Sequence, residues 1–262
     1  MAKVGNLLMP YDLTTFGLGD MLKASPRLRE TATGAATFEL AAQRVCRFLY
    51  DELRGADGER QCALVRCYKT NSFGALEPDL QDFARTLMGF RQPWATMKCL
   101  TLMATVGQTA LWNSRHQSRG HRAIPLPSPE IVEKVPMISQ LIKEFGLELS
   151  NVLQPSPEIV REIAGKRHGV FHVEDALGSP YIPAQQEFVV RFGIRSVLGF
   201  GGLLVNGDLF AVILFTTVRV SEESADRFRT LALDVKSSFS RYNETNTFNQ
   251  MRPSTAGTAR TP

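Results

Sequence analysis

The chain has 262 residues, of which 44% are hydrophobic, enough for one substantial core. Thirty lysines and arginines against 26 acidic residues give a net charge of +4, too mild an excess to imply nucleic-acid binding. The sequence has no apolar run of about 18 residues and no secretory signal pattern, so we expect a cytoplasmic protein without a membrane span.

The cysteines are expected to be buried free thiols in a reducing compartment. None forms a C-x-x-C pair, and all fall within apolar helix or strand patterns. Disulfides and zinc ligation fit these spacings poorly. The four residues are Cys46, Cys62, Cys67 and Cys99.

The first half of the chain alternates helical and extended patterns. Residues 16–22 could begin a short helix that its glycines weaken, and 37–53 trace a clear helical face. A period of two over 61–69 predicts a strand, with Leu64, Arg66 and Tyr68 on one side. A short helix is then expected over 80–87 and a second strand over 97–105.

Residues 106–127 form a long polar connection with little periodicity, of a kind that is usually functional or disordered. The sequence Ser-Pro-Glu-Ile-Val follows at 128–132 and again at 156–160, and each copy is a helix-start signature. Pro136 breaks or restarts the first of these helices. Residues 169–173 then predict a strand and 183–192 a helix.

The segment 193–239 predicts a strand, a tight turn, a second strand and a capped helix. Asn206-Gly207 favours a type I′ hairpin turn, because both residues tolerate positive φ angles. The nearly continuous apolar run 208–215 indicates a central strand covered on both faces. Ser221 is the expected N-cap of the last helix.

These elements predict an α+β fold with an antiparallel central sheet, flanked by N- and C-terminal helices and carrying a long basic loop. We divide the chain into an N-terminal extension (1–34), one folded domain (35–243) and a tail (244–262). The tail is rich in Thr, Ser, Gly, Pro and Arg, and we expect it to be disordered.

Three segments resemble the GAF domain family, a sensory fold related to PAS. Residues 188–202 are similar to its helix, turn and hydrophobic-Arg-Ser passage, and 206–215 to its Asp-Gly strand, with Ala211 where many members have glycine. Residues 220–223 are similar to the start of its last helix. The resemblance implies a divergent regulatory domain that holds a small ligand between its sheet and loops and dimerises through its terminal helices.

The candidate ligand-binding residues lie mainly in the basic loop. Its arginines could bracket an anionic ligand with their planar forks, and its tryptophan could stack on a ring. A solvated basic loop is the alternative. His168 and His172 are four residues apart, which would suit two metal ligands on a helix, but His172 falls in a predicted strand, so no metal site is expected. The candidates are Trp112, Arg115, Arg119, His121, Arg122, His172 and Tyr181.

We therefore expect a stand-alone sensory or regulatory module that binds a small, possibly anionic ligand and signals through dimer or protein-partner contacts. We expect a homodimer, formed by helices near 37–54 and 221–242, and neither nucleic acid nor membrane as a partner. The sequence identifies no cofactor. Two alternatives stay open: an enzyme using thiols or the Arg/His loop, similar to free methionine sulfoxide reductases on a GAF scaffold, and a ligand-free scaffold.

Overall fold

The structure, a computed structural model, describes residues 11–156, 158, 160 and 169–249. Within them the chain forms a six-stranded sheet in the order β3-β2-β1-β6-β5-β4, with every neighbouring pair antiparallel. The predicted α+β class and antiparallel central sheet are confirmed. The strands are β1 (Cys62–Ser72), β2 (Lys98–Gly107), β3 (Ala123–Leu126), β4 (Gly169–Val173), β5 (Ser196–Leu203) and β6 (Leu209–Thr216).

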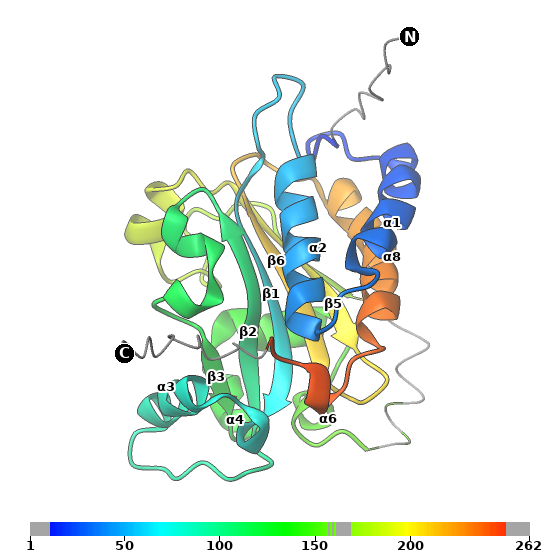
Figure 1. The fold of residues 1–262 in the computed structure, drawn as a ribbon. Coiled ribbons are helices and arrows are strands. Elements are labelled where there is room, and N and C mark those ends of the chain that lie inside the picture. The colour runs from blue at the N-terminus through cyan, green and yellow to red at the C-terminus, as the bar shows by residue number, and fades with distance from the viewer. Residues whose placement is uncertain (1–10, 157, 159, 161–168, 250–262) are drawn as a thin grey trace, which may run out of the picture.

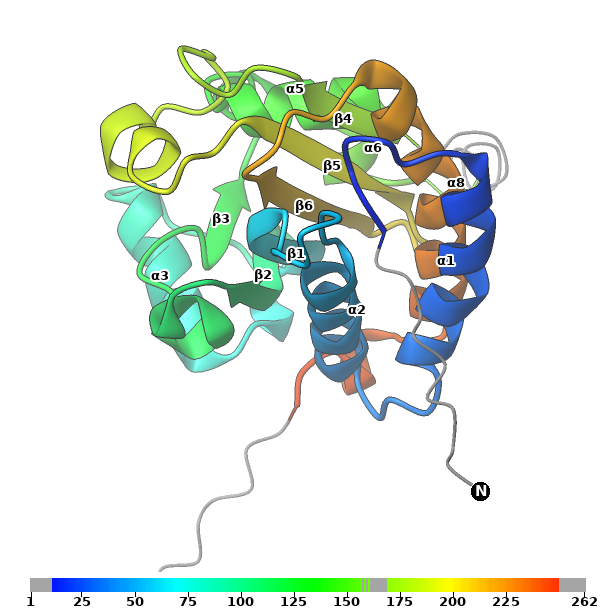
Figure 2. The same cartoon turned by 90° about the horizontal axis from the view of Figure 1, so that it is seen from above.

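Helices cover both faces of the sheet (Figures 1 and 2). On one face α2 and α8 pack on the strands, and α1 packs against both helices. On the other face α5 packs against β4. Helix α3 lies against the edge strand β3 on the same face as α2, where its Leu80 and Ala84 pack with Cys99 and Ala123. No described helix is long and apolar enough to cross a membrane. The helices are α1 (Leu18–Ala32), α2 (Phe38–Glu52), α3 (Pro78–Met88), α4 (Pro129–Val132), α5 (Pro136–Glu144), α6 (Leu149–Leu153) and α8 (Glu222–Phe239).

Strand alternation divides the interior into two main apolar clusters, one on each face of the sheet. In β1, Val65 and Cys67 belong to the cluster under α2 and α8, which we call the helix side. Leu64 and Tyr68 belong to the cluster on the opposite face, which we call the pocket side. Because successive side chains of a strand point to opposite faces, a single strand supplies both clusters.

The central position of β6 is confirmed, since all eight of its residues are buried and it lies between β1 and β5. The predicted type I′ turn is wrong. A type I′ turn needs positive φ at both central residues. Gly207 has a φ of 84°, but among the described residues His121 is the only non-glycine residue with a positive φ, so Asn206 does not take the required conformation. The amide of Gly207 instead donates to the carbonyl of Leu204 at 3.0 Å, and that of Leu204 to Asp208 at 2.8 Å.

The two long helices of the helix side each begin with a hydroxyl cap, and the cap at Ser221 is the one that the sequence predicts. The Thr37 hydroxyl accepts a hydrogen bond from the amide of Leu40 at 3.2 Å, and the Ser221 hydroxyl accepts one from Ser224 at 3.2 Å. Each bond satisfies an amide that has no partner inside its own helix. The apolar stripes behind these caps, which include Phe38 and Phe228, then pack on the sheet.

The polar connection 106–127 contains a strand that the sequence did not predict. Residues 123–126 form β3, which pairs with the beginning of β2 at the edge of the sheet. Its Pro125 is tolerated there because an edge strand does not need every amide for pairing. The expected 183–192 helix appears as a π-helical turn over Gln185–Val190.

Both ends of the described chain join the fold. Helix α1, which falls in the expected N-terminal extension, buries Met21, Ala24 and Leu28 in the helix-side cluster. In the expected tail, Thr247 is buried and Phe248 packs against the core. The rest of the tail, 250–262, lies outside the described residues, as does part of the second Ser-Pro-Glu-Ile-Val segment at 156–160.

Candidate functional site

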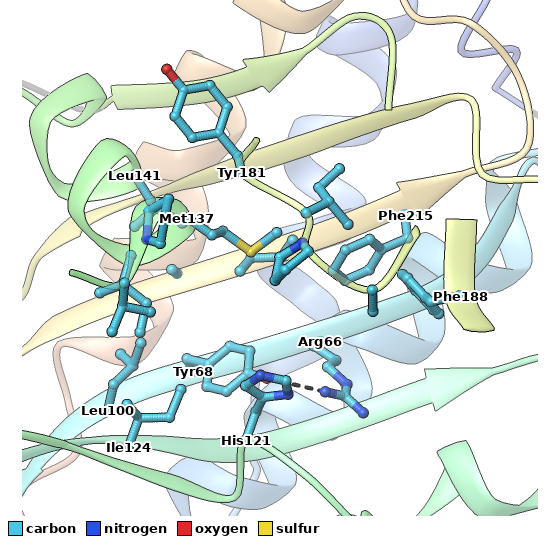
Figure 3. Close-up of a pocket in the computed structure, with 18 of the residues that line it drawn as sticks. Arg66, Tyr68, Leu100, His121, Ile124, Met137, Leu141, Tyr181, Phe188 and Phe215 are labelled. Atoms are coloured by element: carbon cyan, nitrogen blue, oxygen red, sulfur yellow. Dashed lines mark hydrogen bonds between the residues drawn. The ribbon is translucent and has the colours of Figure 1, made fainter. Parts of the chain in front are cut away.

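A cavity of about 320 Å³ lies on the pocket side of the sheet (Figure 3). Its floor is the sheet itself, and its cover is formed by α5 and the segment 181–188. This volume is at the lower end of the range for small-molecule sites. Most of its wall is hydrocarbon, contributed by Leu64 of β1, Leu100 of β2, Ile124 of β3, Leu141 of α5 and Phe215 of β6.

Two local sequence features leave this space open. Ala211 faces the cavity from the central strand β6, where its short side chain fills little of the volume. Pro136 begins α5 after an extended Val135, so the chain turns there and lays Ile138 and Leu141 over the sheet. The cavity is therefore a gap between a flat strand surface and a short covering helix.

Three polar side chains interrupt the apolar wall. Figure 3 shows Arg66, Tyr68 and His121 together at one wall of the cavity, opposite Met137 and Leu141. His121 has a φ of 59°, the left-handed conformation that non-glycine residues rarely adopt. Burial, and then the charge of Arg66, lower the pKa of His121, so the neutral imidazole is favoured beside the arginine.

Arg66 lacks an acidic partner. Its Nη1 donates to the Tyr68 hydroxyl and its Nη2 to the Ser118 hydroxyl, both at 3.3 Å, at the long end for such bonds. Its Nε is buried without any hydrogen-bond partner, and no carboxylate of the described residues forms an ion pair with it. A cation that is partly buried and not neutralised carries a desolvation cost.

Three of the seven predicted site residues line this cavity. They are Trp112, His121 and Tyr181. Trp112 packs against Phe192 in a tilted arrangement with 4.4 Å between ring centroids, and Tyr181 meets Phe171 edge-on at 6.1 Å. The structure thus brings together the aromatic part of the predicted site.

The other four predicted residues lie outside the lining of this cavity. Arg115 is buried between Glu39 and Glu77, with nitrogen–oxygen distances of 2.7 Å to each carboxylate. Arg122 pairs with Asp79, and Arg119 is exposed. His172 alternates with Phe171 along β4, so it faces the helix side, where its Nε2 lies 2.9 Å from the Val220 carbonyl.

Arg66 and Tyr68 were not among the site residues predicted from the sequence. The available signal was the period of two in β1, which already placed Leu64, Arg66 and Tyr68 on one face. An arginine on the inner face of a strand that is covered on both sides is unusual, because charged side chains are seldom buried without partners. On that ground Arg66 was a stronger candidate for a site residue than the arginines of the loop.

The cysteines give no support to a thiol-based site. All four are buried free thiols, as predicted. Burial raises the pKa of Cys99 to about 12 and that of Cys67 well above its usual value, so neither has thiolate character. The register also separates them, because Cys67 pairs with Ala104 whereas Cys99 pairs with Asn71. No group of three or more potential metal ligands occurs among the described His, Cys, Asp and Glu residues.

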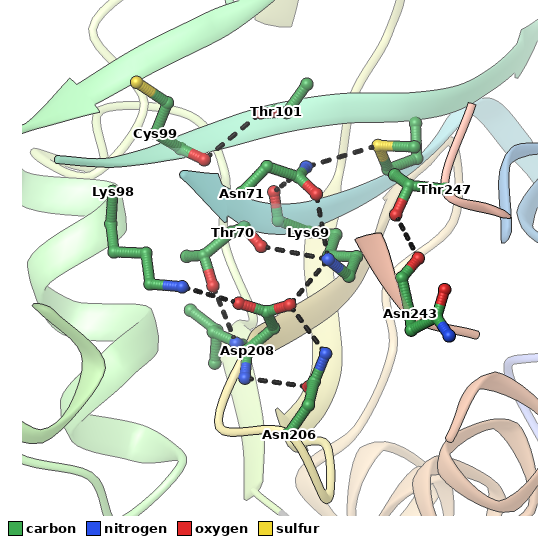
Figure 4. A network of polar contacts seen from close by, with 12 residues as sticks. Lys69, Thr70, Asn71, Lys98, Cys99, Thr101, Asn206, Asp208, Asn243 and Thr247 are labelled. Atoms are coloured by element: carbon green, nitrogen blue, oxygen red, sulfur yellow. Dashed lines mark hydrogen bonds and ion pairs between the residues drawn. The ribbon is translucent and has the colours of Figure 1, made fainter. Parts of the chain in front are cut away.

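A second buried charge site lies on the helix side, where β1, β2 and β6 meet (Figure 4). Lys69 Nζ lies 2.6 Å from one oxygen of Asp208, and Lys98 Nζ lies 2.8 Å from the other. Lys69 also donates to the side-chain oxygen of Asn71 at 2.8 Å, and Asn206 donates to Asp208 at 2.9 Å. Burial alone would raise the pKa of Asp208, but the two lysines outweigh it and hold that pKa below its usual value.

No protein-family model matches the sequence. No curated protein matches it either. Among solved structures, the chain is similar to the GAF domain from a phosphoenolpyruvate-protein phosphotransferase of Coxiella burnetii, at 14% identity and a TM-score of 0.44, covering 84% of this chain and 93% of that one. It is also similar to the free methionine-R-sulfoxide reductase of Neisseria meningitidis in complex with its substrate, at 13% identity and a TM-score of 0.42, covering 85% and 91%.

A third similar structure is the phycocyanobilin-bound GAF domain of a cyanobacterial phytochrome, at 9% identity and a TM-score of 0.39, covering 84% of this chain and 94% of that one. All three likenesses are distant, and two of the three structures are GAF domains, the family that the sequence resembles. These likenesses concern the arrangement of the sheet and helices alone, so the chemistry of the cavity has to be read from this chain's own residues.

Proposed function

We propose that the chain is a GAF-like regulatory module whose small-molecule ligand occupies the cavity on the pocket side of the sheet. The observation that carries this proposal is a 320 Å³ space with a largely apolar wall and a few polar groups at one end. Such a combination is typical of ligand sites, in which apolar surface supplies affinity and sparse polar groups fix orientation. The buried, protonated cysteines favour binding over thiol chemistry.

A thermal-shift screen of small apolar molecules, both neutral and anionic, tests this proposal. A ligand at 100 times its dissociation constant stabilises the folded state by about 2.7 kcal/mol, so a binder raises the melting temperature. Ala211→Leu fills the cavity from the floor and should abolish the shift, and Ala184→Leu should weaken it from the rim. Ala56→Leu, an exposed change outside the lining, is the matched control and should keep it.

A screen without any stabilising compound, or one whose hits bind Ala211→Leu as well as the wild type, would contradict the proposal. If Ala211→Leu does not fold, the rim variant still decides whether the hits occupy this cavity. A filled or closed interior corresponds to the scaffold alternative, which predicts no hits at all.

Signalling through a second copy or a protein partner is the other part of the proposal. The sequence pointed to the helices now seen as α2 and α8, but both pack on the sheet and are partly covered by α1. The large apolar side chains left exposed there are Leu18 and Leu22 on α1 and Leu233 on α8, each more than half exposed. Sedimentation of wild type and Leu22→Glu tests self-association, with the equally exposed Leu87→Glu on α3 as the control.

A further inference from the structure

The ligand's chemical class can be read from the imbalance of charge around Arg66. Its guanidinium carries five N–H donors, of which the structure engages two, both with neutral hydroxyls. The Nε hydrogen is withheld from solvent and has no acceptor. Such a buried polar group costs free energy. The donors that remain for an incoming acceptor are the unused hydrogens of Nη1 and Nη2.

Two other buried cation sites among the described residues are neutralised by carboxylates. Arg115 is held by two glutamates, and Lys69 shares Asp208 with Lys98. Arg66 is different because its neighbours in the cavity wall are a phenol, a histidine that favours its neutral form, and hydrocarbon. The cavity therefore holds one positive charge and no negative one among the described residues.

We infer that the cavity binds a monoanionic amphipathic ligand, a carboxylic acid with a hydrocarbon or aromatic body, whose carboxylate pairs with Arg66. This inference rests on the proposed function and names the ligand class of the same cavity. A carboxylate matches the guanidinium fork and can accept two parallel hydrogen bonds from it. The apolar side chains of the cavity wall, which include Leu64 and Leu141, contact the body of the ligand.

The charge balance favours a monoanion over a phosphate or a nucleotide. One arginine neutralises one negative charge, and a second charge brought into this apolar wall would stay unpaired at a large desolvation cost. A neutral ligand of the same shape could accept a hydrogen bond from Arg66 through a carbonyl oxygen but would leave the arginine without a counter-charge. The ligand class follows from this difference.

Two matched probe pairs test the inference: octanoate against octanamide, and 2-naphthoate against 2-naphthamide. Calorimetric titration of each should show the acid binding at least about 10-fold more tightly than its amide, as expected for a charged hydrogen bond. The indole N–H signals of the two tryptophans locate the probe, because Trp112 lines the cavity and Trp94 does not. Trp94→Phe assigns them.

Arg66→Met should abolish the preference for the acid while leaving amide binding within about twofold, and Arg66→Lys should keep part of it, since a lysine supplies the charge without the fork. Arg119→Met is the matched control, because it removes the same charge from an exposed position outside the cavity, and it should keep the full preference. 2-Naphthyl phosphate at pH 8 should bind more weakly than 2-naphthoate.

Equal affinity of acid and amide in the wild type, or an acid preference that survives Arg66→Met, overturns the ligand class. Tighter binding of the naphthyl phosphate also overturns it, in favour of a phosphorylated ligand. Failure of all four probes overturns it as well. The proposed function falls if the neutral compounds of the thermal-shift screen also fail, or if the hits bind Ala211→Leu as well as the wild type, so the two failures are distinguishable.

Discussion

Strand β1 carries a buried and a half-buried cation on opposite faces of the sheet, and they differ in what surrounds them. Lys69, on the helix side, is almost fully buried and donates to Asp208, to the side chain of Asn71 and to the carbonyl of Thr70. Arg66, on the pocket side, lies three residues earlier and has only long bonds to two hydroxyls. One site is closed and saturated, and the other faces a cavity.

The contrast separates a structural charge from a charge available for binding. Asp208 bridges lysines from β1 and β2 and itself begins the run into β6, so its network ties three strand ends together. The donors that face Asp208 are satisfied within the chain. Arg66 ties Tyr68 and Ser118 weakly and keeps donor capacity, which is what a site for an anionic group requires.

The largest expected effect is on the saturated site. Asp208→Asn leaves Lys69 and Lys98 without a counter-charge, and breaking a buried ion pair in this way should lower the free energy of unfolding by about 3–5 kcal/mol. Urea denaturation measures it. The control is Asp226→Asn, which breaks an exposed helical pair with Arg229 and should cost less than about 1 kcal/mol. Similar losses in both variants would erase the distinction between closed and open charge sites.

A second prediction concerns the buried arginine of the loop. Arg115→Met removes the partner of Glu39 and Glu77, but both glutamates keep some solvent contact. We therefore expect a smaller loss, about 2–3 kcal/mol, in the same denaturation experiment. Arg119→Met, the exposed neighbour, should lie within about 0.5 kcal/mol of the wild type. A negligible loss for Arg115→Met would return this arginine to the list of candidate binding residues.

The third prediction is the reverse of the first two. Arg66→Met replaces a poorly satisfied cation with an apolar side chain of similar length, so the ligand-free protein should stay within about 1 kcal/mol of the wild type. Its deficit should appear in anion binding instead. A loss above about 2 kcal/mol without ligand would show that Arg66 is a structural residue and would remove the contrast within β1.

The fold could largely be predicted because its main elements carry local signals. The helical stripe that begins at Phe38, the apolar run of β6 and the Ser221 cap each specify an element through short-range chemistry. Strand β3 could not be found this way, since only pairing with β2 makes residues 123–126 a strand. The turn at Asn206-Gly207 was mistaken for the same reason, because a longer loop closed by Leu204 and Asp208 replaced the two-residue turn.

The site was harder to predict than the fold because it depends on long-range partners. In sequence, Arg115, Arg119, Arg122 and Arg66 are equivalent cations, and nothing local says which of them meets a carboxylate. Glu39 and Glu77, which neutralise Arg115, lie 76 and 38 residues away from it. The aromatic candidates fared better, since Trp112 and Tyr181 both line the cavity. Large aromatic side chains in loops tend to cover apolar surface wherever the fold provides it.

The smallest expected effect concerns His121, the third polar residue of the cavity wall. Burial, and then the charge of Arg66, hold its folded pKa below the ordinary 6.5, so below that pH the unfolded chain binds the proton more readily than the folded one. The contribution of His121 to the free energy of unfolding is therefore constant above about pH 6.5 and decreases as the pH falls from there toward the folded pKa. The wild type should therefore lose more stability between pH 7.5 and pH 5 than His121→Asn.

Asparagine is the right replacement at this position because it tolerates the left-handed φ of 59° without carrying a titratable group. Denaturation at both pH values measures the difference, and His116→Asn, an exposed change in the same loop, serves as the control. The same His121→Asn substitution is then made in the Arg66→Met background. If the two side chains interact, it should change the pH dependence of stability less there than in the wild type. Identical pH dependence of stability in the wild type and His121→Asn would contradict this prediction. It would mean that the imidazole ring is solvated in the folded protein.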